Sequence, residues 1–250
     1  MELWPAEPIW EQVSPLLPGF TVEVLPEIDS TNAALMRRAR AGQTEPTLLV
    51  AERQTAGRGR LGRPWQSAPG DSLTFSLGLP FSPTDWSGLS LAVGLSLVES
   101  LHADIGLKWP NDLWWQDRKL AGILIEAATA GQQSQVVIGI GINIRLRPAE
   151  GLSTPPAALT ELWPQATAGE ALLRLMPALV RTLQDFEQHG FAPLQARFEA
   201  RGVLRGREVH TSDGLQGQAL GVGPSGALRL LQAAGERLID SSEVSVRPRP

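Results

Sequence analysis

The stretch KLAGILIE, residues 119–126, starts with a charged residue and continues as an apolar run typical of a buried strand. The run IGIGIN, residues 138–143, places Gly139 and Gly141 between isoleucines. Because successive side chains of a strand point to opposite faces, these two glycines share one face of their strand. Gly122 likewise removes a side chain from the first run. The pattern predicts a sheet face cleared for a flat ring system; the alternative is that the glycines only relieve packing.

Further strands and helices are expected on both sides of these runs. Apolar or alternating runs predict strands at residues 22–25, 47–52, 73–79, 105–108 and 113–115, the third of them half-buried because its period is two. Helices are predicted at residues 33–41, 89–101, 170–188 and 193–201. Asp29 to Asn32 offer N-cap residues for the first helix, and Pro177 should kink or split the third. Residues 1–20 hold four prolines and little periodicity and are expected to form a short lead-in that covers the main domain. Residues 145–168 are expected to form a loop with one short helical turn.

The pattern changes after Gly202 to short strand-like runs separated by turn residues. These runs occupy residues 208–210, 216–221, 227–231, 236–239 and 244–247. Short strands at this spacing predict a small closed or nearly closed barrel. We therefore expect an α+β protein, with a mixed sheet and helices over residues 1–202 and a small β-barrel over residues 203–250.

Composition excludes several classes of protein. The chain has 250 residues, a formal net charge of −4 and no cysteine, which excludes disulfides, thiol catalysis and wholesale nucleic-acid binding. The three histidines, His102, His189 and His210, have no partner at metal-ligand spacing. The sequence shows neither a secretory signal nor a run of about 18 to 20 apolar residues that a membrane helix needs. We expect a cytoplasmic protein that contacts no membrane.

Four arginines interleaved with glycines mark residues 53–65. Arg53, Arg58, Arg60 and Arg63 fall within eleven residues of an acidic chain, and glycines at 57, 59 and 62 let backbone N–H groups approach a ligand. The segment predicts an anion-binding loop, with a solvated surface loop as the alternative. It also fits the pattern G-x-G-x-x-G, but the nearby prolines leave no room for the helix that a dinucleotide site requires. The chain contains no Walker sequence.

A second polar cluster follows the strand predicted at residues 105–108. Lys108 stands at the end of that strand beside Trp109 and Pro110, and its compact charge suits a carboxylate or an α-phosphate. Asn111 can donate and accept hydrogen bonds, and Asp112 could pair with an arginine or hold Mg²⁺ through water. The alternative is that Trp-Pro-Asn-Asp only forms a turn.

Taken together, GRGRLGRPW at 57–65, KWPNDL at 108–113, KLAGILIE at 119–126 and IGIGIN at 138–143 resemble the catalytic domain of the biotin–protein ligases. Residues 29–32 resemble the early Ser-Thr-Asn segment of that family, and residues 226–247 resemble its C-terminal barrel. The resemblance covers roughly residues 22–247. It implies a class II synthetase-like catalytic domain followed by an SH3-like barrel.

The resemblance also implies roles for individual residues. Lys108 and Arg58 are expected to be catalytic. The residues expected to bind biotin are Ser30, Thr31, Asn32, Gln54, Arg58, Gly59, Arg60, Lys108 and Gly122. Those expected to bind the nucleotide are Arg58, Arg60, Arg63, Trp65, Asn111, Lys119 and Asn143. No protein metal site is assigned, because Mg²⁺ is expected to arrive on the phosphates of ATP.

The implied reaction joins biotin to ATP as biotinyl-5′-AMP and then transfers biotin to a lysine of a biotin carboxyl carrier domain. Residues 54–66 are expected to be mobile when empty and to order around the adenylate. Because only about 20 residues precede the catalytic domain, we expect no DNA-binding domain. An exposed edge strand near residues 136–144 could pair two copies of the chain. The alternatives are a lipoate or octanoate ligase of related fold, and a biotin-binding module without transfer activity.

Overall fold

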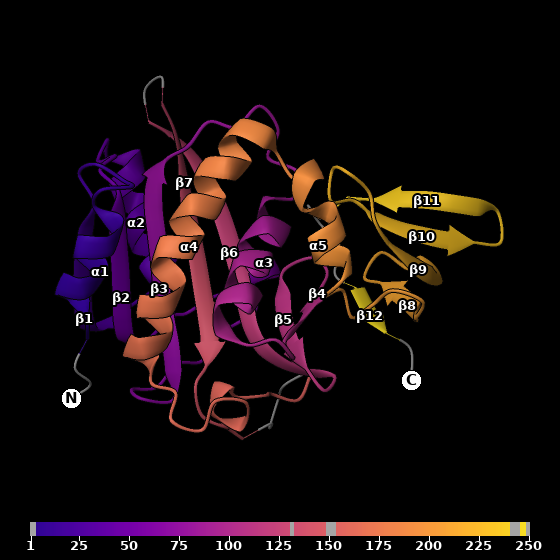
Figure 1. Ribbon diagram of the computed structural model, residues 1–250, viewed down its shortest axis with the longest axis horizontal. Helices are drawn as coiled ribbons and strands as arrows, with labels where there is room; N and C mark the ends of the chain where they lie inside the picture. The colour runs from indigo at the N-terminus through magenta and orange to yellow at the C-terminus, as the bar shows by residue number, and fades with distance from the viewer. Residues whose placement is uncertain (1–3, 131–132, 149–153, 241–245, 249–250) are drawn as a thin grey trace.

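The computed structural model describes residues 4–130, 133–148, 154–240 and 246–248. A seven-stranded sheet runs through the larger part of the molecule in the order β1-β2-β3-β7-β6-β5-β4 (Figure 1). Its strands are β1 (Thr21–Ile28), β2 (Thr47–Gln54), β3 (Ser72–Pro80), β4 (Gly106–Lys108), β5 (Asp112–Trp115), β6 (Arg118–Ala130) and β7 (Gln133–Asn143). β1 pairs with β2 in parallel and every other pair is antiparallel, so the sheet is mixed as expected.

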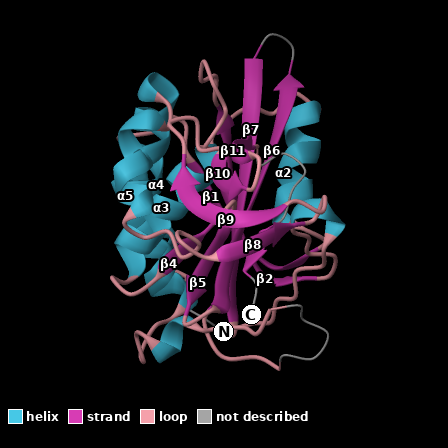
Figure 2. Cartoon of the chain, turned by 90° about the vertical axis from the view of Figure 1, so that its right-hand side faces the viewer, coloured by secondary structure: helices cyan, strands magenta, loops and turns pink. Residues whose placement is uncertain are grey.

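One face of the sheet is covered by the helices α3 (Leu89–Leu101) and α4 (Ala168–His189) (Figure 2). Both helices contribute to one large apolar core. A capping box between Thr167 and Glu170 begins α4, which runs through Pro177 as one helix. Of the two expected effects of Pro177, a kink or a split, the split does not occur. The buried apolar face of α4, which packs on α3, supplies more stability than one lost backbone hydrogen bond removes.

The segment before β1 is also more ordered than its prolines indicated. Residues Ala6–Val13 form helix α1, which contacts α4 and β1. Ile9 and Val13 are buried in the main core. Pro5 stands at the N-cap of this helix and Pro8 lies in its first turn, where the missing N–H groups cost nothing. This segment therefore covers the main domain as expected, and it does so as a helix because these prolines fall at positions that a helix tolerates.

Helix α2 (Thr31–Arg40) covers the opposite face of the sheet (Figure 2). The Ser30 side chain accepts a hydrogen bond from the backbone of Ala33, which confirms the predicted N-cap. Leu35 and Met36 of this helix pack with Leu49 and Val137 of the sheet in a second, smaller core. This second core holds α2 on the sheet but leaves space between the beginning of the helix and the strands.

Two expectations about single strands were wrong. β3 is buried on both faces and not half-buried, because helices cover the sheet on both sides. β7 is not an edge strand, because it lies between β3 and β6. The edges of the large sheet are β1 and β4, so pairing of two copies through residues 136–144 is excluded.

A short connecting segment joins the large sheet to a smaller one. It consists of the 3-10 turn Ala192–Leu194 and helix α5 (Gln195–Glu199), which is shorter than the helix predicted there. The smaller sheet has the order β11-β10-β9-β8-β12. Its strands are β8 (Glu208–Thr211), β9 (Gln216–Val222), β10 (Leu228–Gln232), β11 (Gly235–Ile239) and β12 (Val246–Pro248). All five predicted strands are present, although residues 244–245 of the last one lie outside the described residues. Within the described residues no ladder joins β11 to β12, so they do not form a closed barrel.

The two sheets contact each other directly. The indole Nε1 of buried Trp109 donates to the carbonyl oxygen of Gly226 at 3.0 Å. Leu107 on β4 pairs with Gly202 in the connecting segment. Lys108 therefore lies at the junction of the two sheets. Over the described ranges, no helix has both the length and the apolar character needed to cross a membrane.

Candidate active site

The register of the large sheet lines up small residues on the face below α2. One row of paired positions crosses five strands, and the next row crosses four. Positions that pair across neighbouring strands project to the same face, so each row is continuous. The first row is Ala51, Thr74, Gly141, Gly122 and Asp112, and the second is Leu49, Ser76, Gly139 and Leu124. The two rows form a trough that starts at polar hydroxyls and ends at a carboxylate.

Side chains from outside the sheet lie in the space that the glycines leave. A Cβ atom on Gly139 would overlap the side-chain oxygen of Asn32, and one on Gly141 would overlap the indole of Trp65. Arg147 stacks on the Trp65 ring at 5.2 Å from its centroid. The glycines therefore share one face of the sheet as predicted, and side chains of the protein itself lie over two of them; that this face accepts a flat ring system stays a prediction. The close approach of Asn32 and Trp65 requires glycine at both positions.

The closed end of the trough, which we call the inner pocket, has a volume of about 390 Å³ including space open to solvent. It lies between the start of α2, the arginine–glycine loop and the trough. Of the residues expected to bind biotin, it brings together Ser30, Thr31, Asn32, Gln54, Arg58, Gly59 and Gly122. It also includes Trp65, Thr74 and Ser76.

A chain of hydrogen bonds connects the polar side chains of the inner pocket. The backbone N–H of Thr31 donates to Gln54 Oε1 at 2.7 Å, and Thr31 Oγ1 lies 2.8 Å from Ser76 Oγ. Ser76 Oγ donates to Asn32 Oδ1 at 3.1 Å. Thr31, Asn32 and Ser76 are each at most 3% exposed. Buried groups bonded in this way are held rigidly, which prepares the pocket for a ligand of fixed hydrogen-bonding pattern.

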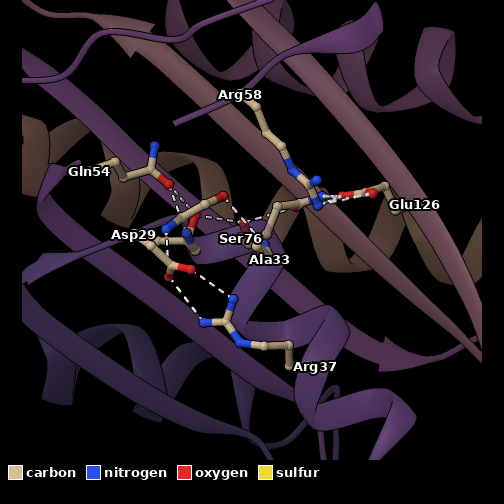
Figure 3. Close-up of polar contacts among 10 residues, drawn as sticks. Asp29, Ala33, Arg37, Gln54, Arg58, Ser76 and Glu126 are labelled. Carbon is tan, nitrogen blue, oxygen red and sulfur yellow. Dashed lines mark hydrogen bonds and ion pairs between the residues drawn. The ribbon is translucent and has the colours of Figure 1, made fainter. Parts of the chain in front are cut away.

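Glu126 on β6 joins α2 to the arginine–glycine loop (Figure 3). Its carboxylate accepts from Asn32 Nδ2 at 2.5 Å and from Arg58 Nη2 at 3.3 Å. Asp29 anchors the same end of α2 through two hydrogen bonds from Arg37, which lower the pKa of the Asp29 carboxyl. The Arg58 guanidinium is 44% exposed, so its ion pair with Glu126 is weak enough to be exchanged for a ligand.

The arginine–glycine loop folds back on itself above the trough. Its backbone is closed by hydrogen bonds from Gly59 to Arg63 and from Trp65 to Gly57. A Cβ atom at Gly57 would overlap the carbonyl oxygen of Trp65, and Gly62 adopts a φ of +69°. These two glycines therefore permit the turn that carries Trp65 onto Gly141. The loop contains one 3-10 turn, Arg60–Gly62, and no α-helix opens from it, which confirms that the G-x-G-x-x-G match is not a dinucleotide site.

The open end of the trough, which we call the outer groove, has a volume of about 1260 Å³ including space open to solvent. Its described lining carries six cationic side chains and one carboxylate. The cations are Arg60, Arg63, Lys108, Lys119, Arg147 and Arg247, and the carboxylate is Asp112. Such a surplus of positive charge is suited to a polyanion.

Lys108 and Lys119 both lie beside Asp112. Lys119 Nζ is 2.7 Å from Asp112 Oδ1, and Lys108 Nζ is 3.8 Å from Asp112 Oδ2. Lys108 also lies 5.5 Å from the centroid of the Trp114 ring. Burial lowers the pKa of Lys108 to about 8; Asp112 opposes this change, and the neighbouring cations Lys119, Arg63 and Arg247 add to it. A buried, poorly compensated ammonium group is stabilised when an anion binds beside it.

Two of the predicted nucleotide residues mainly hold the backbone. Asn111 lines the outer groove, but its Nδ2 donates to the carbonyl of Ile123 at 2.7 Å. Asn143 lines neither region, and its Nδ2 donates to the carbonyls of Lys119 and Ala157. Asn111 therefore shapes the groove from its edge, whereas Asn143 ties the segment around Ala157 to β6.

Sequence reasoning missed several residues of the site. Ser76, Thr74 and Glu126 lie in or beside the inner pocket, and Arg147 and Arg247 line the outer groove. Thr74 and Ser76 are two residues apart in an otherwise apolar strand, so they share one face, and this was the available signal. Arg247 gave no comparable signal, because it comes from the smaller sheet.

Carboxylates and histidines do not gather into a metal centre. The described part of the chain has no group of three or more His, Cys, Asp or Glu residues that could hold a metal ion. In the outer groove, Asp112 is the single described carboxylate, and two lysines already neutralise it. The residues present do not fit a magnesium ion held by protein ligands alone.

Comparisons with known proteins agree with this arrangement. Residues 24–143 match the model of the biotin/lipoate A/B protein ligase family. The bifunctional ligase/repressor BirA of Escherichia coli is 37% identical to this chain, and the alignment covers 95% of the chain and 77% of BirA. The biotin–[acetyl-CoA-carboxylase] ligase of Paracoccus denitrificans is 32% identical over 88% of this chain and 98% of its own length. The structure of the Aquifex aeolicus biotin protein ligase in complex with biotin and ATP has a TM-score of 0.80 and 31% identity, covering 91% of this chain and 99% of that one.

Proposed function

The chain belongs to the biotin protein ligase family, and from that premise we propose how its two binding regions divide the reaction. The protein is a ligase that activates biotin with ATP as biotinyl-5′-AMP and transfers the biotin to a protein. In our proposal, the inner pocket holds the fused rings of biotin and the outer groove holds ATP. The observation that supports this division is the trough, whose floor leads from the hydroxyls of Thr74 and Ser76 over Gly141 and Gly122 to the cationic groove, with the Trp65 indole lying over Gly141 between the two regions.

The inner pocket suits a ring with both donors and acceptors. The urea group of biotin offers two N–H donors and one carbonyl acceptor, and the pocket presents hydroxyl and amide groups from Ser30, Thr31 and Gln54. Gly122, Gly139 and Gly141 line the inner pocket without side chains of their own, and the rings would lie beside Asn32 and Trp65. A lipoyl ring carries no N–H or carbonyl group and would leave these buried polar groups without partners, which favours biotin over lipoate.

The outer groove suits the chemistry of activation. The biotin carboxylate attacks the α-phosphorus of ATP, the bond to pyrophosphate breaks, and negative charge builds on the phosphoryl oxygens. Lys108, held at the end of β4, is placed to offset this charge, and Arg58 can leave Glu126 to assist it. Arg60, Arg63, Trp65 and Lys119 would contact the nucleotide from the sides of the groove. Gly59 borders both regions, where the carboxylate and the phosphate meet.

Magnesium would enter with the triphosphate. Because the groove supplies only Asp112 and that carboxylate is paired with two lysines, the phosphate oxygens would be the main ligands of the ion. For the second step we propose a lysine of a biotin carboxyl carrier domain as the acceptor. Its amine attacks the carbonyl carbon of the adenylate, and AMP leaves.

A two-stage assay tests the proposed function. The first stage compares pyrophosphate release with biotin, lipoate or octanoate as the acid, and the second follows labelled biotin into a carrier domain. We expect pyrophosphate release with biotin and not with lipoate or octanoate. We expect the label to enter only a carrier domain that retains its acceptor lysine. Release with lipoate and not biotin would assign the chain to the other branch of the family. Biotin binding without release would identify a module that lacks transfer activity.

A further inference from the structure

Glu126 is the one described acidic residue that touches both α2 and the arginine–glycine loop at the inner pocket. It contacts Asn32 at 2.5 Å and Arg58 at 3.3 Å, and it is not itself among the residues that line the pocket. A carboxylate can only accept hydrogen bonds. It therefore dictates which end of the Asn32 amide faces it, and this has consequences beyond Asn32.

The orientation of Asn32 fixes the direction of the whole hydrogen-bond chain. With Nδ2 turned to Glu126, Asn32 presents Oδ1 to Ser76, so the single proton of the Ser76 hydroxyl must point to Asn32. Ser76 can then only accept in its 2.8 Å contact with Thr31, and the Thr31 hydroxyl must be the donor. Gln54 Oε1, 3.2 Å from the same hydroxyl, is satisfied instead by the backbone N–H of Thr31.

This proton order leaves both lone pairs of Thr31 Oγ1 for a ligand. If the Asn32 amide were reversed, Nδ2 would donate to Ser76, Ser76 would donate to Thr31, and Thr31 would donate to Gln54. One lone pair of Thr31 would then be filled from within the protein. The two orders use the same residues and the same distances, but they present different patterns to a ring.

We propose that Glu126 is a positioning and specificity-determining residue, which sets the inner pocket to accept from an N–H group and so selects a cyclic urea. The proposal rests on the proposed function, because it concerns the biotin ring. Glu126 acts through Asn32 and Ser76, and it contacts neither the ring nor the phosphates. Its ion pair with Arg58 is a separate contact and affects ligands that differ only in the ring equally.

The test compares biotin with two analogues. In each analogue one of the two urea N–H groups is replaced by a ring oxygen, which gives a cyclic carbamate of nearly the same shape. The measured quantity is the ratio of kcat/KM for biotin to kcat/KM for the analogue, from pyrophosphate release. Each of the two analogues gives one such ratio for the wild-type protein. We expect Glu126→Leu to lower the larger ratio about tenfold, because the hydrogen-bond chain is then free to turn a proton toward the ring oxygen. Glu126→Gln, which keeps the size of the side chain, should lower the ratio in the same direction because an amide can donate as well as accept.

A double-mutant cycle with Ser76→Ala separates this role from a general loss of order. If Glu126 acts through Ser76, Glu126→Leu should change the ratio little once Ser76 is alanine. Glu23→Leu is the matched control, because Glu23, like Glu126, contacts α2 and pairs with an arginine, here Arg38, but lies away from the inner pocket; it should leave the ratio unchanged. A ratio that stays at the wild-type value in both Glu126 variants overturns the proposal. Failure of the wild-type chain to release pyrophosphate with biotin overturns the proposed function instead.

Discussion

The inner pocket and the outer groove share one floor but are built from opposite kinds of side chain. In the inner pocket, Thr31, Asn32 and Ser76 are buried and bonded to one another. In the outer groove, six described cations surround Asp112, and burial lowers the pKa of Lys108. A satisfied neutral network can give shape and selectivity but little force on a reacting phosphate. An excess of positive charge can give that force but discriminates poorly between anions. We therefore expect changes in the inner pocket to alter binding of the acid and changes in the outer groove to alter the rate.

The largest effect is expected from Lys108→Met. Removing one preorganised charge from a phosphoryl-transfer site typically lowers the rate by about 10²- to 10³-fold. The affinity for biotin alone should change by less than about threefold, because Lys108 does not line the inner pocket. Pyrophosphate release and calorimetric biotin titration measure the two quantities. Lys119→Met is the control, since that lysine is more exposed, and its effect should be smaller. Equal losses of rate and of biotin affinity would contradict the division into two regions.

Thr31→Val is expected to have a smaller effect, and on the KM for biotin rather than on the rate. Valine keeps the shape of threonine but leaves the buried Ser76 and the ring without their partner, which costs about 1–2 kcal/mol. The KM for biotin should rise about 5- to 30-fold, whereas kcat and the KM for ATP should change far less. Thr21→Val, on the edge strand β1, removes a hydroxyl with a similar hydrogen bond and should change none of the three constants. A fall in kcat as large as the rise in KM would show that the regions are not separable.

The smallest expected effect is the pH dependence of kcat/KM, which reports on Lys108 in the outer groove and not on the neutral inner pocket. Because the pKa of Lys108 is about 8, its ammonium form is lost as the pH rises through that value in the free enzyme. The value of kcat/KM should be level below pH 7 and fall about tenfold between pH 7 and pH 9. In kcat the fall should lie at higher pH, because bound phosphates raise the pKa of the lysine. Lys108→Arg should abolish the alkaline fall, since a guanidinium stays charged. An alkaline limb that persists in that variant would assign it to another group.

Much of the large sheet was predictable because its strands and helices carry clear periodic signals. Helix α3 begins and ends at the predicted residues, and Lys108 lies at the end of a strand as expected. The arginine–glycine loop was also identified correctly as a loop. Its composition leaves few alternatives.

What the sequence did not reveal depends on register and on distant contacts. Ser76 matters because it pairs across the sheet with Gly139, and no single sequence shows which residues of two strands lie opposite each other. Pro177 was expected to divide α4, yet the packing of that helix on α3 overrides the local preference. Glu126 was part of a recognised motif, but its bond to Asn32 joins residues 94 positions apart.

Arg247 on β12 lines the outer groove, and this has a consequence for the order in which the protein is made. The described residues that line the inner pocket lie between Ser30 and Gly141, and helix α4, which packs under the sheet, ends at His189. At a translation rate of about 5–20 residues per second, Arg247 follows His189 by roughly 3–12 s. During that interval the residues that line the inner pocket have all been synthesised, while the outer groove still lacks one of the cations of its lining. The outer groove is therefore completed only after the smaller sheet has been made.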